Sequence, residues 1–420
     1  MAWSLGRGSR FEVFREPLRK ELGQSRVRLH DLVRGAVVRT VSSTLRAAHE
    51  FTPYDDRRGP LFRSPDRDPH DHWSPRCARR MMLNMVDALD LQIINALQIH
   101  PRVSWAQLGR VLRVDPSTIS RRWSVLTKER QVWTSCYEGP GARSKEPIVS
   151  ALVEIRCAPG RRGDVIAELA RQGPIFSVHC TSGPRDLYIM ISTHSLLSMD
   201  RYIDEHIVVT PGIVGTRTHY LRTVFLEGSG FRLNALADDQ VKALQHLRPS
   251  DPPQQRKPAY HEIIQALGAD VRRTTADLQR DLGRSLAVVS RDIDALLAAS
   301  WVRWRVDFAH TLLGWSAAAV LWLNVQQSDL ERIVASFGQL NQVRLCASVT
   351  GQANLAVFLW LHNLQELDEI EGRLGAVFPR VLIKDRWIVP RIAKRTGYIL
   401  DLDSRRLRYV PITSQPVFED

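Results

Sequence analysis

The sequence has little cysteine, and it lacks a long hydrophobic segment. Its five cysteines are far apart and include no CxxC pair of the kind that metal and redox sites use. Scattered free thiols are typical of a reducing compartment, so we expect a cytoplasmic protein without a disulfide framework. The longest apolar stretch covers 312–325, which is shorter than the roughly 20 residues of a membrane-spanning helix. The N-terminal region has no apolar run typical of a signal peptide.

The signatures of common catalytic and nucleotide-binding sites are also missing. The sequence contains no nucleophile elbow, P-loop, GxGxxG or HExxH motif, and its carboxylates are scattered over predicted helix surfaces. We therefore expect neither enzymatic activity nor a cofactor. His70 and His72 lie close together, but no second pair of ligands accompanies them, which favours a solvated tract over a metal site.

A basic excess is the most informative feature of the composition. The 420 residues carry a formal net charge of +13, with 44% hydrophobic and 25% charged residues. Such a chain forms real hydrophobic cores, and its charge predicts an anionic partner, either nucleic acid or an acidic membrane face. Residues 1–80 are rich in Arg, Pro and Asp and show little periodicity, so we predict a disordered basic extension there.

The remainder of the chain contains a repeat of about 170 residues. Residues 89–126 align with 259–296 without gaps, and Ser120-Arg121 then lies opposite Ser290-Arg291. Further along the chain, Gly183 lies opposite Gly351, and Pro211 lies opposite Pro379. A repeat of this length indicates duplication of a whole module rather than a solenoid.

The first part of each module has the pattern of a helix-turn-helix. Helices are predicted over 87–99 and 104–112, followed by a three-residue turn. Asp115 is a good N-cap for the next helix, and Pro116 suits its first turn. Ile119, Trp123 and Leu126 then form its apolar face. We predict helix-turn-helix domains over 86–133 and 259–304.

The opposite face of the helix that starts at Pro116 is polar and basic. In a helix-turn-helix this second helix enters the major groove, where arginine bonds guanine and hydroxyl groups bond bases or phosphates. A basic amphipathic helix is also commonly a solvated surface, but the preceding helix, the turn spacing and the net charge favour DNA contact. The predicted DNA-binding residues are Ser117, Thr118, Ser120, Arg121, Arg122 and Ser124.

The second copy of this helix has lost much of that face. Leu286, Ala287 and Val288 stand where the first copy has Pro116, Ser117 and Thr118, and carboxylates occupy the positions of Arg122 and Ser124. Carboxylates near phosphate weaken binding, because the attraction depends on the number of phosphates neutralised. We predict that this degenerate copy contributes little base reading and mainly serves as a scaffold or contacts the DNA backbone.

The second part of each module alternates strands and helices in the order βαββαβ. This is the ferredoxin-like arrangement, so the fold class is α+β, a tandem repeat of a winged-type helix-turn-helix followed by a ferredoxin-like domain. The prolines after 247 interrupt regular structure and mark an inter-module linker, which includes a predicted helix over 237–247. The predicted segments are a first ferredoxin-like domain at 147–227, a linker at 228–258, a second such domain at 315–395 and a tail at 396–420.

These motifs together resemble the Lrp/AsnC family of transcription regulators. Residues 86–126 resemble the N-terminal domain of the family, TSGPRDLYIMI at 181–191 resembles the glycine turn of its effector-sensing (RAM) domain, and PGIVGTRTHYLRTV resembles its final strand. The resemblance covers about 86–227 and, more weakly, 259–395. It implies a cytoplasmic, nucleoid-associated bacterial regulator that binds double-stranded DNA and a small effector, for example an amino acid.

The resemblance also implies ligand-binding residues and a mode of assembly. Carried over by position, Gly183 and Asp186 are ligand-binding candidates, and Gly351 and Asn354 are their counterparts. Glycine and aspartate in turns are often purely structural, so both interpretations stay open. RAM domains pair in the family, so one chain with two modules could form an intramolecular pseudo-dimer or assemble further as a homo-oligomer.

One alternative function belongs to a different class. Siroheme decarboxylases resemble this arrangement of helix-turn-helix and RAM-like halves, and they depend on His and Arg in the cleft. His179 lies on a predicted strand and could serve such a site, although a lone strand histidine is more often a hydrogen-bonded core residue. The intact Ser/Thr/Arg face at 117–124 favours the regulator.

Overall fold

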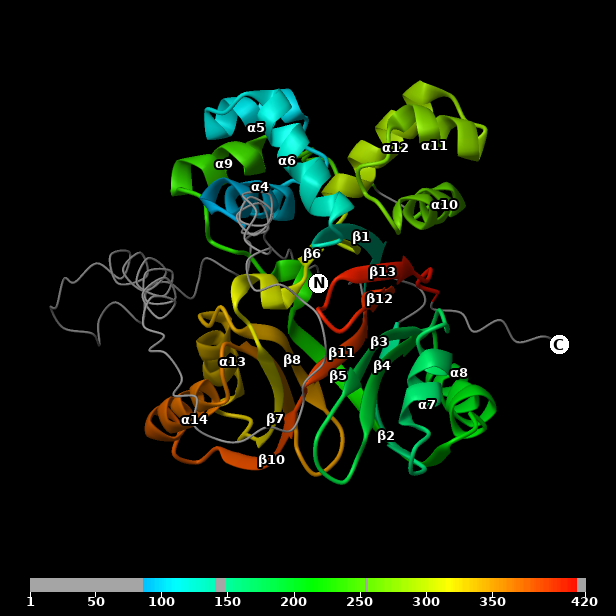
Figure 1. Ribbon diagram of the computed structural model, residues 1–420, viewed down its shortest axis with the longest axis vertical. Coiled ribbons are helices and arrows are strands. Elements are labelled where there is room, and N and C mark those ends of the chain that lie inside the picture. Colours follow the sequence, from blue (N-terminus) through cyan, green and yellow to red (C-terminus); the bar gives the residue numbers. More distant parts are fainter. Residues whose placement is uncertain (1–85, 140–147, 254–255, 414–420) are drawn as a thin grey trace, which may run out of the picture. The chain divides into compact units, whose positions relative to one another are not determined.

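The computed structural model describes residues 86–139, 148–253 and 256–413 (Figure 1). The predicted N-terminal extension, with His70 and His72, lies outside the described residues. The described part of the chain contains no helix long and apolar enough to cross a bilayer. The four cysteines in the same part are free thiols.

The first helix-turn-helix consists of α4 (Ala88–Ile99), α5 (Trp105–Leu112) and α6 (Pro116–Lys128). Each helix begins at a side-chain cap, formed by Asp87, Ser104 and Asp115 respectively. These caps satisfy amide groups that have no partner within the helix, which fixes where each helix starts. Ile93, Leu108 and Ile119 pack together in the core between the helices and are fully buried.

The second helix-turn-helix repeats the first almost residue for residue. Its helices are α10 (Pro258–Leu267), α11 (Thr275–Leu282) and α12 (Leu286–Ala298). The bounds of α11 and α12 equal those of α5 and α6 shifted by 170 positions. The structure therefore confirms the duplicated helix-turn-helix of the predicted fold class.

A strand follows each helix-turn-helix, and the two strands pair with each other. β1 (Val132–Glu138) and β6 (Val302–Phe308) form an antiparallel two-stranded sheet, in which Ser135 lies opposite Arg305. Ser135 and Arg305 are also equivalent positions of the repeat, 170 residues apart. The pairing therefore has approximate twofold symmetry about this point, as expected where two copies of one module face each other.

Two reciprocal arginine contacts hold the helix-turn-helix domains together. Arg102 of the first copy donates to the carbonyl oxygens of Val271 and Arg273. Its repeat equivalent, Arg272, donates to the carbonyl oxygens of Pro101 and Val103 at 2.9 and 3.1 Å. The guanidinium of Arg272 also lies over the ring of Trp105, 3.8 Å from the centroid. The same residue type thus makes the same contact in both directions.

Both ferredoxin-like halves have the predicted βαββαβ order. In each half the helices cover one face of the sheet with a separate apolar core. The first half contains β2 (Val149–Cys157), α7 (Arg162–Leu169), β3 (Ile175–Cys180), β4 (Leu187–Thr193), α8 (Leu196–Tyr202), continued by the π-helical turn η1 (Ile203–Val208), and β5 (Ile213–Glu227). The second contains β7 (Ala317–Asn324), α13 (Leu330–Gly338), β8 (Val343–Val349), β9 (Leu355–Leu361), α14 (Gln365–Val377) and β10 (Leu382–Ile388).

The two halves share one sheet of eleven strands, in the order β10-β7-β9-β8-β5-β2-β4-β3-β11-β12-β13. The long strand β5 pairs with β2 of its own half and, beyond Leu221, with β8 of the other half. In the opposite direction, β11 (Arg391–Arg395) follows the second half but pairs with β3 of the first. A single chain therefore supplies both halves of a paired sheet, and a strand from each half pairs with a strand of the other half.

Two segments that the sequence placed outside the modules are structured. Residues 396–413 add β12 (Tyr398–Leu400) and β13 (Arg406–Tyr409) to the edge of the sheet. The linker contains α9 (Asp238–His246), the predicted helix, and lies beside α4 and α5 (Figure 1). The buried side chains of Asn95 and Gln98 accept hydrogen bonds from the backbone of 235 and 233 at 2.8 and 3.0 Å. The linker is thus docked on the first helix-turn-helix.

Short 3₁₀ turns lie at η2 (Gly228–Gly230) and η3 (His310–Leu313).

Candidate nucleic-acid interface and ligand turns

The start of α6 is fixed by a short polar network. The Asp115 carboxylate accepts hydrogen bonds from the amide and the hydroxyl of Ser117 at 2.8 and 2.5 Å, and from the amide of Thr118 at 3.4 Å. The bonds from Ser117 lower the pKa of Asp115, because they favour the charged form. The first turn of α6 is therefore rigid before any ligand arrives.

The faces of α6 divide as the sequence predicts. Ile119, Trp123 and Leu126 are buried, whereas Ser117, Arg121 and Ser124 are exposed and Thr118 and Ser120 are half-buried. The exposed residues form a face of small hydroxyl groups around one long cation. A surface of this composition allows close approach to a groove and offers Arg121 to a base edge.

Arg122 is engaged within the protein. Its Nη1 donates to Asp87 Oδ2 at 2.6 Å and to Asp90 Oδ1 at 3.1 Å, which joins α6 to the start of α4. Burial alone would lower the pKa of Arg122, but its hydrogen bonds to the carboxylates of Asp87 and Asp90 raise it. The structure thus separates Arg122 from the other predicted DNA-binding residues, because two carboxylates already compensate its charge.

The second copy reverses the charges at this brace. Asp292 occupies the position of Arg122, and Lys257 occupies the position of Asp87. Asp292 is buried, whereas Arg291, the equivalent of Arg121, is exposed. Asp292 pairs with Arg291 at 3.5 Å, so the exchange of sign does not reproduce the Arg122 brace between the helices of the second copy.

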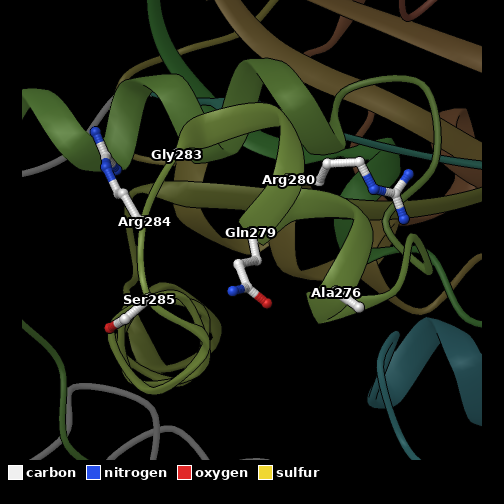
Figure 2. Close-up of a pocket in the computed structure, with 6 residues that line it drawn as sticks. All are labelled: Ala276, Gln279, Arg280, Gly283, Arg284 and Ser285. Atoms are coloured by element: carbon white, nitrogen blue, oxygen red, sulfur yellow. The ribbon is translucent and has the colours of Figure 1, made fainter.

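The turn between the two helices also differs between the copies. A side chain on Gly109 would meet the carbonyl oxygen of Val114 at 2.8 Å, so the first copy requires glycine for its tight turn. The second copy has Gln279 at this position and a hollow of about 620 Å³ beside it. Figure 2 shows Gln279 between Arg280 and Arg284, which extend to opposite sides. These arginines pair with Asp277 and Glu262, so the turn of the second copy offers little free positive charge.

The four predicted ligand-binding residues lie in two equivalent turns. Gly183 and Gly351 both have left-handed backbone angles, with φ of 89° and 119°. Asp186 Oδ2 accepts from the amide of Cys157 at 2.7 Å. Asn354 makes the corresponding contact with the amide of Val325 at 2.9 Å and also donates to its carbonyl oxygen. Both polar side chains therefore brace the neighbouring strand end, and Asn354 replaces Asp186 without loss of that contact.

A buried polar network connects the two turns. Arg185 Nε donates to Glu154 Oε2 at 2.6 Å, and the other oxygen of Glu154 lies 2.7 Å from His219 Nε2. The second ring nitrogen of His219, Nδ1, lies 3.1 Å from the carbonyl oxygen of Thr350. Side chains added at Gly183 and Gly351 would approach Arg185 and His219 within 3.2 and 3.0 Å. Arg185, Glu154 and His219 thus form one series of contacts that runs from one glycine turn to the other. We name these three residues the bridge network.

Sequence reasoning missed the bridge network. Its repeat equivalents are Ala353, Trp322 and Trp387, so the alignment gave no conserved polar pattern to follow. The available signal was Glu154 itself, the single carboxylate in a largely apolar strand. A buried carboxylate requires a partner. Burial raises the pKa of Glu154, but the bonds from His219 and Arg185 outweigh this and lower it.

Two family models match the first module. Residues 86–126 match the AsnC-type helix-turn-helix domain, and residues 150–228 match the Lrp/AsnC ligand binding domain. A helix-turn-helix transcriptional regulator of Pyrococcus horikoshii, itself uncharacterised, is 25% identical over 139 residues, which are 33% of this chain and 87% of that protein. The transcriptional regulator Ptr1 of Methanocaldococcus jannaschii is 22% identical over 145 residues, 34% of this chain and 97% of that protein.

Solved structures show more distant similarity. The siroheme decarboxylase NirDL, in complex with an iron-uroporphyrin III analogue, has a TM-score of 0.49 at 12% identity and covers 77% of this chain and 95% of its own. AsnC of E. coli has a TM-score of 0.28 at 20% identity and covers 33% of this chain and 93% of its own. Similarity of this degree does not define the activity of the present chain.

Proposed function

Because its first module belongs to the Lrp/AsnC family, we propose that this chain is a sequence-specific DNA-binding transcription regulator controlled by a small molecule. The observation that carries the proposal is the exposed face of α6, with Ser117, Arg121 and Ser124 outward and the apolar residues inward. The fixed Asp115 cap presents this face in one conformation. Preorganisation of this kind reduces the entropy lost on binding.

The residues of α6 have different roles in this proposal. Arg121 reads a base edge, while Ser117, Thr118, Ser120 and Ser124 bond bases or phosphates along the groove. Arg122 orients α6 through Asp87 and Asp90 rather than reading DNA. The second helix-turn-helix supports the first through the reciprocal arginines and contributes little base reading, so the operator is asymmetric.

We place the effector at the two glycine turns. Gly183 with Asp186 forms one turn and Gly351 with Asn354 the other, and the bridge network connects them. A ligand that moves either turn displaces Arg185 or His219, and through Glu154 it changes the junction between the two halves of the sheet. The effector is an amino acid or a similar small metabolite, and the pseudo-dimer within one chain is the functional unit.

A binding titration on the upstream DNA of the protein's own gene tests the proposal. Arg121→Ala should weaken specific binding about 5- to 150-fold, equivalent to 1–3 kcal/mol, and should relax the sequence preference. Arg291→Ala, at the equivalent position of the second copy, is the matched control and should change affinity little. Affinity of the wild type should fall steeply with salt, because phosphate contacts release counterions.

Two results would contradict this function. If the purified chain shows no preference for any promoter fragment over random DNA at physiological salt, the α6 face is a solvated surface. If Arg291→Ala weakens binding as much as Arg121→Ala, the division of labour between the two copies is wrong. An enzymatic role would instead require turnover that survives loss of the Arg121 side chain.

A further inference from the structure

Four buried basic side chains that are not part of the bridge network gather beside β9. The guanidinium carbons of Arg344 and Arg395 lie 4.0 and 4.9 Å from the centroid of the Trp360 ring, and the ring of His310 lies 5.3 Å from it. His179 lies 5.0 Å from the ring of Phe358 on the same strand. We name this group the cationic cluster. Each of its members is at most 7% exposed.

Most hydrogen-bonding atoms of the cationic cluster have no partner. Nε and Nη2 of Arg344 and Nε and Nη1 of Arg395 are buried without a hydrogen bond. Neither ring nitrogen of His179 has a partner, so the expectation of a hydrogen-bonded core histidine is wrong. The indole nitrogens of Trp315 and Trp360 are also unpaired. Buried polar atoms are almost always bonded, so a concentration of exceptions needs a physical explanation.

The positive charge of the cluster is not balanced by the carboxylate beside it. Asp307 accepts two bonds from Arg305, at 2.9 and 2.8 Å, and lies 3.8 Å from Nε of Arg395. Burial, together with Arg395, lowers the pKa of Arg344, and burial lowers that of Arg395 to about 10. Aromatic faces offset part of this cost, since Arg344 also lies 3.5 Å from the ring centroid of Phe231. They leave the N–H groups unsatisfied.

The repeat shows that the fold does not require these basic side chains. The first half has Phe176 at the position of Arg344 and Glu227 at the position of Arg395, and the second half has Ala347 at the position of His179. Phe176 is buried, as Arg344 is. The same strand positions are therefore filled with apolar or acidic residues in the other copy, and the cluster is an addition to one side of the pseudo-dimer.

We propose that the cationic cluster binds a small oxyanion, the carboxylate or phosphate group of a metabolite, with Arg344 and Arg395 as its principal partners. The free N–H groups of two guanidiniums match the paired oxygens of such a group. His310 and the indole N–H of Trp360 provide further donors. This site goes beyond the proposed DNA-binding function and uses none of the residues of the glycine turns or of the bridge network.

Thermal melting of the full chain tests the oxyanion site without DNA. A negative result for this site can therefore be distinguished from a negative result for DNA binding. Inorganic phosphate and citrate are the probes, each titrated against sodium chloride at matched ionic strength. The wild-type melting temperature should rise with either probe or both, by about 3–5 °C at 100 times the dissociation constant, with the logarithmic dependence of a saturable site. A response to phosphate alone or to citrate alone identifies which oxyanion the site prefers.

Arg344→Phe is the decisive variant, because the first copy carries Phe176 at this position. It should melt at or above the wild-type temperature in chloride and should lose the response to the probes. Arg373→Gln, on the exposed surface of α14, is the matched control and should respond like the wild type. If Arg344→Phe does not fold, Arg395→Gln and tryptophan fluorescence titration of the wild type replace it.

Two outcomes would overturn the proposal. The first is a rise in melting temperature that has the same size in Arg344→Phe and the wild type, or that grows in proportion to salt without saturation. Such a rise reflects exclusion of the salt from the protein surface rather than binding. The second is the absence of any change in the wild type in melting and in tryptophan fluorescence, which would mean that the cluster is compensated by ordered water alone.

Discussion

Replacement of Glu154 by glutamine tests whether the bridge network holds the two halves of the sheet together. Glu154 is 8% exposed, and its two oxygens contact Arg185 and His219 at 2.6 and 2.7 Å. Glutamine keeps the size of the side chain but removes the charge and one acceptor. The remaining ion pair of Arg185 is then the one with Asp385, whose side chain is 46% exposed.

The expected loss of stability is worked out from burial. Hydrogen bonds to a charged group contribute about 1.5–3 kcal/mol each, and removal of one partner from a buried ion pair costs about 3–5 kcal/mol. Because glutamine still accepts one bond, we expect the free energy of unfolding to fall by about 3 kcal/mol at pH 7. Glu168→Gln, which removes the exposed pair with Arg171, should cost less than about 0.5 kcal/mol.

Urea denaturation followed by tryptophan fluorescence is the assay. The rings of Trp322 and Trp387 lie 4.6 and 6.4 Å from that of His219, and Arg185 lies over Trp387, so their emission reports this region. The pH dependence is a second readout. The bonds to Glu154 lower its pKa, so its stabilisation is complete above the ordinary value of 4.5 and is lost as pH falls through the folded-state value. The difference between wild type and variant should therefore close in acid.

The reasoning fails if Glu154→Gln is no less stable than Glu168→Gln at pH 7. It also fails if the difference between wild type and Glu154→Gln stays constant between pH 7 and pH 3, since an effect of shape alone would not titrate.

Two further predictions each compare a variant with a matched control in the same chain. Asp186→Asn should leave the melting temperature nearly unchanged, because Asn354 makes the same hydrogen bond to the backbone in the second half. Asp186→Ala should lower the free energy of unfolding by about 1–2 kcal/mol. Equal losses in the two variants would show that the contact depends on the charge of Asp186. Gly109→Ala should destabilise the first helix-turn-helix by about 1–3 kcal/mol, because the new side chain meets Val114 at 2.8 Å. Gly163→Ala in α7 should instead stabilise the protein by about 0.5–1 kcal/mol, because no atom lies within 4 Å of the added methyl group. Equal melting temperatures for the Gly109 and Gly163 variants would contradict the steric argument.

The sequence by itself determined the local structure and the duplication. Helix caps and apolar spacing act within one or two turns of a helix, so they can be predicted from the order of residues. The caps are Asp87, Ser104 and Asp115, and the apolar positions of α6 are Ile119, Trp123 and Leu126. The βαββαβ order, the fold class and the helix within the linker follow from the same kind of pattern. The exposed face of α6 was predictable for the same reason.

Only the tertiary structure decided which partner each polar side chain has. Arg122 meets Asp87 from 35 positions away, Arg185 meets Asp385 from 200, and β3 pairs with β11 across both modules. The cationic cluster likewise combines residues from β3, β8, β11 and the turn at His310. Periodicity describes the direction of a side chain relative to its own helix or strand. It carries no information about which distant residue lies opposite, and the contacts of Arg122 and Asp186 are with residues of that kind.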